Sequence, residues 1–115
     1  MDHGLLPPEF LASLLALRAE LDAVDAQFVS LLAARFAITD RIGALKATHG
    51  VAAADPAREQ AQLERLSSLS SDLGLPSQVT CAVYEILFQF VRANHLARAE
   101  LATPSPRVER LGPSD

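Results

Sequence analysis

The stretch from Phe10 to Thr48 constrains the fold more than any other feature of the chain. It contains no proline and a single glycine, Gly43, and it is rich in alanine, leucine, arginine and glutamate, which favour helices. Its apolar residues recur at alternating intervals of three and four and form a seam made of Leu14, Leu17, Leu21, Val24, Phe28, Leu31, Ile38, Ile42 and Leu45. This apolar seam predicts one helix of about 38 residues, roughly 57 Å long.

A helix of this length does not fit inside a small domain. The chain has 115 residues, and a compact domain of that size has a radius of gyration of only about 13 Å. The helix would protrude from such a domain with its apolar seam uncovered. Packing against a second copy of the chain is the simplest way to bury this seam, so we expect a homodimer.

A second helix is predicted to start at Asp55-Pro56, with aspartate as its N-cap and proline at its first position. The first helix ends at His49-Gly50, because glycine favours the left-handed conformation found just after a helix. The apolar stripe of the second helix consists of Leu63, Leu66 and Leu69.

A third helix is predicted from about Ser77 to Leu101, after a turn over residues 73–77. Its inward-facing residues are expected to be Val79, Val83, Ile86, Leu87, Phe90 and Val91. No segment alternates between apolar and polar residues as a half-buried strand would, so the expected fold is all-α.

The chain is expected to divide into three segments. Residues 1–9 are interpreted as a flexible N-terminal segment and residues 10–102 as the helical domain. Residues 103–115 are interpreted as a disordered tail, since Pro104 and Pro106 stop the third helix.

Composition excludes several classes of protein. The net charge of −4 is opposite to that of most nucleic-acid binders. The single cysteine, Cys81, excludes an intrachain disulfide framework and a thiolate cluster for zinc. The N-terminus lacks the basic start of a secretory signal, and no apolar run reaches the roughly 20 residues that span a bilayer. We therefore expect a cytoplasmic protein without membrane or nucleic-acid partners.

Arg35 interrupts the apolar seam between Leu31 and Ile38. A cation in an apolar seam is unfavourable unless it is paired. One interpretation is that Arg35 pairs with a carboxylate such as Asp40 or extends its charge to water. The other is that it belongs to an anion site inside a helical bundle.

Two further cations lie on the same predicted helix. Lys46 follows Arg35 by eleven residues, close to three turns, so both project from nearly the same side and lie about 16 Å apart along the axis. Arg18 precedes Arg35 by seventeen residues, which places it about 25 Å away on a different side. Arg18 and Arg35 therefore cannot meet around one small molecule within a straight helix, but Arg18 could reach the site of a partner in an antiparallel dimer.

The segment Asp55-Pro56-Ala57-Arg58-Glu59 carries a cation where acids are preferred. The first turn of a helix favours negative charge, so Arg58 is placed against the local preference. An exposed Arg-Glu pair is the structural interpretation of this segment. A pocket for a small polyanion is the functional one, and the joint spacing of the cations favours it.

With these residues in view, the sequence resembles the all-helical, AroQ-class chorismate mutases. The resemblance covers roughly Leu14 to Glu100. It is carried by four matching features: Leu17-Arg18-Ala19-Glu20-Leu21-Asp22-Ala23-Val24-Asp25, Leu31-Leu32-Ala33-Ala34-Arg35, Lys46 and Asp55-Pro56-Ala57-Arg58-Glu59. It implies a homodimer of intertwined, antiparallel three-helix chains with two equivalent active sites, each completed by Arg18 of the partner subunit.

The reaction that the resemblance implies is the pericyclic rearrangement of chorismate to prephenate, the committed step towards phenylalanine and tyrosine. This intramolecular reaction requires no metal, nucleophile or redox cofactor. Chorismate carries two carboxylates. The resemblance assigns one of them to Arg35 together with Arg18 of the partner subunit, and the other to Arg58, with bidentate contacts that also fix orientation.

The remaining site residues are also assigned through the resemblance. Lys46 would donate to the ether oxygen, while Asp55 and Glu59 would orient the ring hydroxyl. In a count without gaps, Val91 falls at a position that is commonly serine in the family, and His95 at one that is commonly glutamine. His95 could replace the glutamine as a second donor to the ether oxygen if the correct ring nitrogen carries a proton. Alternatively, His95 lies on a polar helix face beside Arg92 and Arg98.

Three other functions share these features. An isochorismate-pyruvate lyase has the same fold and cationic site, but the intact Asp55-x-x-Arg58-Glu59 favours the mutase. An aminodeoxychorismate mutase is a further variant. A non-catalytic helical dimerisation module is disfavoured because each cation stands at family spacing.

Overall fold

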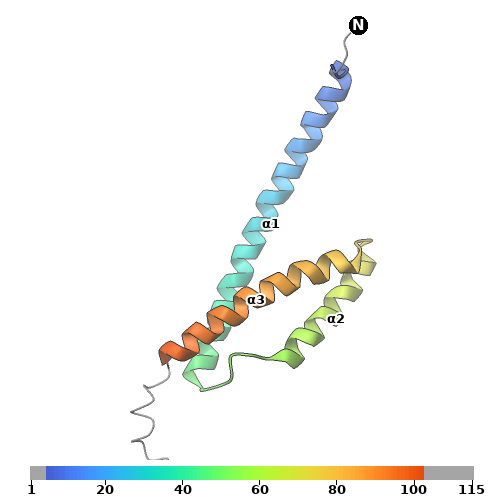
Figure 1. Cartoon of the computed structure of the whole chain (residues 1–115). Helices are drawn as coiled ribbons and strands as arrows, with labels where there is room; N and C mark the ends of the chain where they lie inside the picture. The colour runs from blue at the N-terminus through green and yellow to red at the C-terminus, as the bar shows by residue number, and fades with distance from the viewer. Residues whose placement is uncertain (1–4, 103–115) are drawn as a thin grey trace, which may run out of the picture. The chain divides into compact units, whose positions relative to one another are not determined.

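The computed structural model describes residues 5–102, which form three helices and, over that range, no strand (Figure 1). The helices are α1 (Pro8–Thr48), α2 (Pro56–Asp72) and α3 (Ser77–Ala102). The all-α prediction with a long first helix is therefore confirmed. The expectation of a disordered tail over residues 103–115 lies outside the described residues, as do the first four residues of the expected N-terminal segment.

Helix α1 comprises 41 residues and begins at Pro8, two residues before the predicted start. Proline is tolerated in the first turn of a helix because the N–H that it lacks has no partner there. At the other end, Val51 N donates to Lys46 O at 2.9 Å and Gly50 N donates to Ala47 O at 3.3 Å, with Gly50 at φ 65°. This is the Schellman arrangement that the glycine predicted.

Helix α2 begins as the sequence predicts. Asp55 is its N-cap, and the Asp55 carboxylate accepts a hydrogen bond from the backbone N–H of Arg58 at 3.1 Å. Pro56 occupies the first turn. The helix ends before Gly74, whose φ of 73° again allows a reversal of the chain.

Helices α2 and α3 form an antiparallel hairpin (Figure 1). Leu66 of α2 and Phe88 of α3 are its buried apolar residues, and Tyr84 packs edge-on against Phe88 with ring centroids 6.2 Å apart. The hydroxyls of Ser70 and Thr80 form a hydrogen bond near the turn. These contacts fix how the first turn of α2 lies against α3.

The inward face of α3 differs from the predicted one. Phe88 and His95 are buried, whereas Val79, Ile86 and Phe90 are exposed in the single chain. Phe88 and His95 are seven residues apart, so they lie on one helix face. The prediction was wrong for the three exposed residues because α3 is rotated so that a neighbouring face, which includes a histidine, packs inward.

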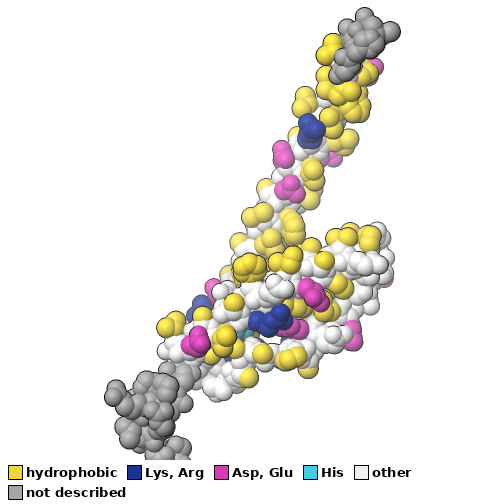
Figure 2. All heavy atoms as spheres, viewed as in Figure 1, with side chains coloured by type: hydrophobic (Ala, Val, Ile, Leu, Met, Phe, Trp, Pro, Cys, Tyr) yellow, Lys and Arg dark blue, Asp and Glu magenta, His cyan; other side chains and the backbone are white. Residues whose placement is uncertain are grey.

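The described chain consists of two compact units, divided between Phe36 and Ala37. The first unit is the N-terminal part of α1, and Figure 2 shows apolar side chains on its surface. In this unit Phe28 is 50% exposed and Leu31 68% exposed. The second unit contains the last turns of α1 together with α2 and α3, and it holds the buried residues named above.

Candidate functional site

Arg18 and Arg35 both lie on α1, in the first unit. Arg18 is exposed and Arg35 is half-buried. Asp40, the carboxylate considered as a partner for Arg35, lies in the second unit with Oδ2 at 3.7 Å from Arg98 Nη2 of α3. The structure thus gives Asp40 an ion pair with α3.

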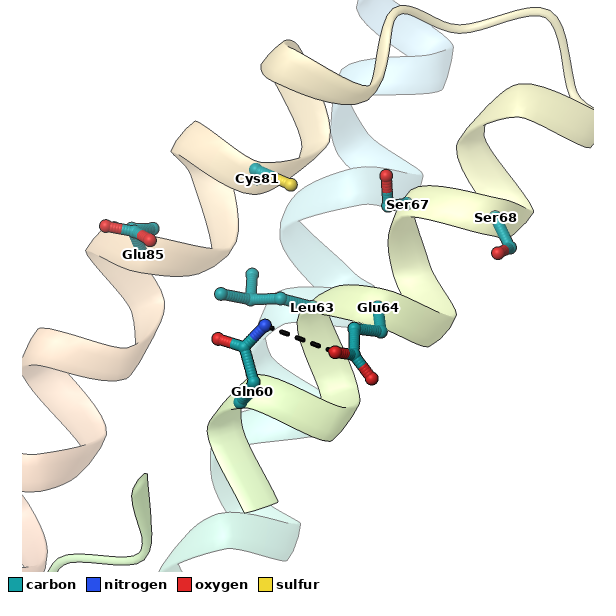
Figure 3. A pocket seen from close by; sticks show the side chains of 7 residues that line it. All are labelled: Gln60, Leu63, Glu64, Ser67, Ser68, Cys81 and Glu85. Atoms are coloured by element: carbon teal, nitrogen blue, oxygen red, sulfur yellow. Dashed lines mark hydrogen bonds between the residues drawn. The ribbon is translucent and has the colours of Figure 1, made fainter. Parts of the chain in front are cut away.

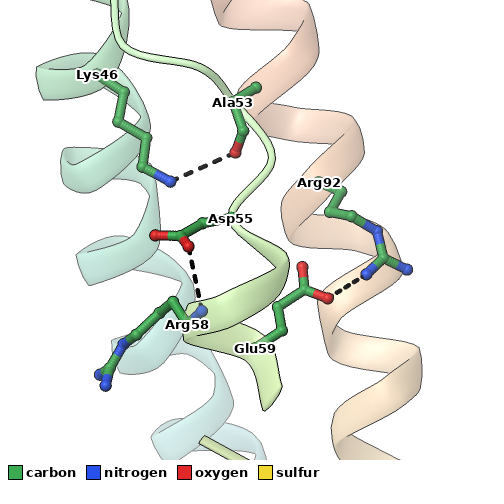
Figure 4. A network of polar contacts seen from close by, with 6 residues as sticks. All are labelled: Lys46, Ala53, Asp55, Arg58, Glu59 and Arg92. Atoms are coloured by element: carbon green, nitrogen blue, oxygen red, sulfur yellow. Dashed lines mark hydrogen bonds and ion pairs between the residues drawn. The ribbon is translucent and has the colours of Figure 1, made fainter. Parts of the chain in front are cut away.

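Lys46 lies in the last turn of α1 and is half-buried. Its Nζ donates to the backbone oxygen of Ala53 at 3.4 Å (Figure 4). Ala53 precedes the N-cap Asp55 by two residues, so this contact holds the ammonium near the start of α2. A lysine ammonium carries three N–H donors, and Ala53 takes one of them.

Asp55, Arg58 and Glu59 lie together at the start of α2. In Figure 4 the Arg58 side chain extends to one side of this helix start and Glu59 extends to the other, toward α3. Arg58 is exposed, whereas the Glu59 side chain is only 23% exposed. The second unit therefore brings together Lys46 and the three predicted residues of α2.

Glu59 has a partner that is not among the site residues predicted from the sequence. Its Oε1 forms an ion pair with Nη1 of Arg92 on α3 (Figure 4). The pairs Glu59–Arg92 and Ser70–Thr80 are both nearly symmetric about Leu75 in the turn between the helices. Reflecting the sequence about Leu75 would have placed Glu59 opposite residue 91, directly beside Arg92.

His95 is 6% exposed and connects α3 to the last part of α1. Its Nε2 lies 2.8 Å from the backbone oxygen of Thr39. Because a carbonyl oxygen only accepts, Nε2 carries the hydrogen of this bond. His95 is therefore buried against α1, unlike the more exposed Arg92 and Arg98, and does not lie on an open polar face.

The His95 imidazole has space against α1 only because residue 43 is a glycine. A Cβ added at Gly43 would lie 2.6 Å from Cδ2 of His95. Val91, one turn before His95 on α3, is half-buried and brings no hydrogen-bonding group. Of these two α3 residues, only His95 carries a polar side chain.

A separate groove of about 450 Å³ lies between α2 and α3 (Figure 3). It is lined by Gln60, Leu63, Glu64, Ser67, Ser68, Cys81 and Glu85. Within it, Gln60 Nε2 donates to Glu64 Oε2 at 3.4 Å. Two carboxylates and no lysine or arginine line this groove, so its charge does not suit an anionic ligand.

The described residues form neither a metal site nor a membrane-spanning helix. Among residues 5–102, no three histidine, cysteine, aspartate or glutamate side chains lie close enough together to hold a metal ion. None of the helices in that range combines the length and apolarity needed to cross a membrane.

Comparison with known families gives one match. The model of the family described as chorismate mutase type II matches residues 17–96, which is more than two thirds of the chain. The matched range includes every predicted site residue from Arg18 to His95. No curated protein matches the chain.

Proposed function

The chain belongs to the chorismate mutase type II family, and from this membership we propose that it converts chorismate to prephenate by an intramolecular pericyclic rearrangement. Family membership makes the protein an enzyme of the isomerase class. The observation that carries the proposal is the grouping of Lys46 with Asp55, Arg58 and Glu59 around the start of α2.

The substrate explains why an acidic protein needs these cations. Chorismate is a dianion, and its two carboxylates must be held so that the reacting ends meet. Arg58 anchors one carboxylate, and Arg35 together with Arg18 of the partner subunit anchors the other. Guanidinium groups suit this task because two parallel N–H donors fix the angle of a carboxylate as well as its position.

Lys46 supplies a hydrogen-bond donor to the ether oxygen, whose C–O bond breaks in the reaction. Negative charge grows on the ether oxygen as its C–O bond lengthens, and an ammonium already in place stabilises that charge without reorganisation. A donor of this kind contributes about 3 kcal/mol to lowering the barrier. The Ala53 contact supports this role because it holds Nζ near Asp55, the proposed partner of the ring hydroxyl.

His95 can serve as a second donor only through Nδ1, since Nε2 donates to Thr39. Both ring nitrogens carry hydrogen only in the protonated imidazole. Direct donation by His95 to the ether oxygen therefore requires the charged form. In this proposal Val91 lines the same side of α3 without donating.

The proposed enzyme is an antiparallel homodimer with intertwined first helices. Exposed apolar residues support it: Leu17, Leu21 and Leu31 of the seam are each more than half exposed in the single chain. Removing apolar area from water is favourable by about 25 cal/mol per Å², and this gain must exceed the entropy that two chains lose on association. The dimer also lets Arg18 act on a substrate whose other contacts come from the partner subunit.

A direct assay tests the function. The purified chain is incubated with chorismate and, separately, with isochorismate, and products are identified by chromatography. We expect prephenate from chorismate. Salicylate with pyruvate from isochorismate, and no prephenate, would instead identify an isochorismate-pyruvate lyase, and absence of both reactions would favour a non-catalytic module.

A further inference from the structure

We propose that Arg92 is a positioning residue that holds the Glu59 carboxylate in the active site. The inference rests on the proposed function, because it deepens the role of a residue assigned to that site. Arg92 Nη1 and Glu59 Oε1 form an ion pair between α3 and α2, across 33 residues of sequence. Figure 4 shows the two side chains pointing toward each other.

Geometry is the first reason. A glutamate side chain has three rotatable bonds, and its carboxylate must stay in one place to accept a hydrogen bond from a ring hydroxyl. Arg92 bonds Oε1, and the carboxylate has a second oxygen, Oε2, for that hydroxyl. The ion pair with Arg92 thus holds the Glu59 side chain in place, and Glu59 Oε2 remains as an acceptor for the ring hydroxyl.

Charge is the second reason. A dianionic substrate and an ionised Glu59 repel each other, and this repulsion strengthens where water is partly excluded. Glu59 is only 23% exposed, so water screens its charge incompletely. The guanidinium of Arg92 offsets that charge and allows a carboxylate to serve in a site for a dianion.

Stability alone does not account for the pair. Arg92 is 45% exposed, and exposed ion pairs contribute little to folding. The chain offers a matched comparison in Arg98, six residues further along α3 and 42% exposed, which pairs with Asp40. Asp40 has no role in the proposed site. Removing Arg98 therefore measures the effect of losing one cation and one ion pair from the same helix.

A double-mutant cycle tests the inference. Steady-state kcat and KM for chorismate are measured for the parent, Arg92→Gln, Glu59→Gln and the double variant. We expect Arg92→Gln to lower kcat/KM about tenfold in the parent and less than about twofold in the Glu59→Gln background, because its effect passes through Glu59. Arg92→Lys should restore part of the loss, and Arg98→Gln should leave kcat/KM unchanged.

Several results would overturn the inference while leaving the proposed function intact. One is an equal loss from Arg92→Gln in both backgrounds, which would mean that Arg92 contacts the substrate itself. Another is parent-like activity in Arg92→Gln. A third is a matching loss in Arg98→Gln, which would point to general charge or folding. A parent chain inactive on chorismate would overturn the proposed function, and the role of Arg92 with it.

Discussion

The imidazole of His95 on α3 occupies the space that a side chain at Gly43 on α1 would need. A Cβ at Gly43 would lie 2.6 Å from Cδ2 and 3.1 Å from Nε2 of His95, and Nε2 is the atom that donates to Thr39. Gly43 precedes Lys46 by three residues, so it lies about one turn away on the same side of α1. The contact therefore sets how closely α3 approaches the turn that carries Lys46.

Gly43→Ala should destabilise the protein despite a gain in helix propensity. Alanine in a helix interior is favoured over glycine by about 1 kcal/mol. Here the added methyl group would displace a buried ring, and overpacking of this kind costs about 1–3 kcal/mol. Denaturant unfolding should show a net loss of stability, and kcat should fall because the turn carrying Lys46 moves.

The His95→Ala background provides the control for Gly43→Ala. With the ring removed, the nearest remaining neighbour of the new methyl group is Cδ of Arg98, at 3.2 Å. Because that side chain is long and can shift, Gly43→Ala should become neutral or stabilising in this background. An equal loss of stability in both backgrounds would show that the contact with His95 is not the cause.

Asp55 combines two roles that one pair of substitutions can separate. Its carboxylate caps α2 through the N–H of Arg58 and is proposed to orient the ring hydroxyl. Asp55→Asn keeps an oxygen for the cap, so stability should stay within about 0.5 kcal/mol of the parent, whereas Asp55→Ala should lose about 1 kcal/mol. Both should lower kcat/KM if the charge matters to the substrate, and parent-like turnover by Asp55→Asn would limit this residue to capping.

His95→Gln should preserve both the fold and turnover. Glutamine carries permanent N–H donors, so it can bond Thr39 or the ether oxygen without becoming charged. His95→Ala removes a buried ring and its hydrogen bond and should lower the free energy of unfolding by about 2 kcal/mol. Turnover is measured alongside unfolding. A His95→Ala protein that is destabilised but retains parent kcat would make His95 a packing residue only.

The helix boundaries could be predicted because short-range chemistry determines them. Gly50 and Asp55 act on backbone groups within a few residues of themselves, and the structure confirms both. The seam also predicted a single long helix, whose described length differs by only a few residues.

The contacts between helices could not be predicted in the same way. The ion pair of Glu59 with Arg92 depends on the register of two helices, and the burial of His95 depends on the rotation of α3 about its axis. Apolar spacing indicated Val79, Ile86 and Phe90 as the inner face because spacing alone does not show which of two neighbouring apolar faces packs inside the chain. The close approach at Gly43 was not predicted, although a glycine inside a strong helix costs about 1 kcal/mol relative to alanine and therefore calls for a packing explanation.

The last prediction tests whether one active site uses two chains. Arg18→Ala and Lys46→Ala are prepared as separate, nearly inactive proteins, then unfolded, mixed in equal amounts and refolded. If Arg18 acts on a substrate held by Lys46 of the partner subunit, a mixed dimer has one site with both substitutions and one with neither. Random pairing makes half of the dimers mixed, so about a quarter of all sites should be intact and activity should recover to about a quarter of the parent level. Mixed dimers, verified by mass spectrometry, that stay as inactive as their components would show that each site is built within one chain.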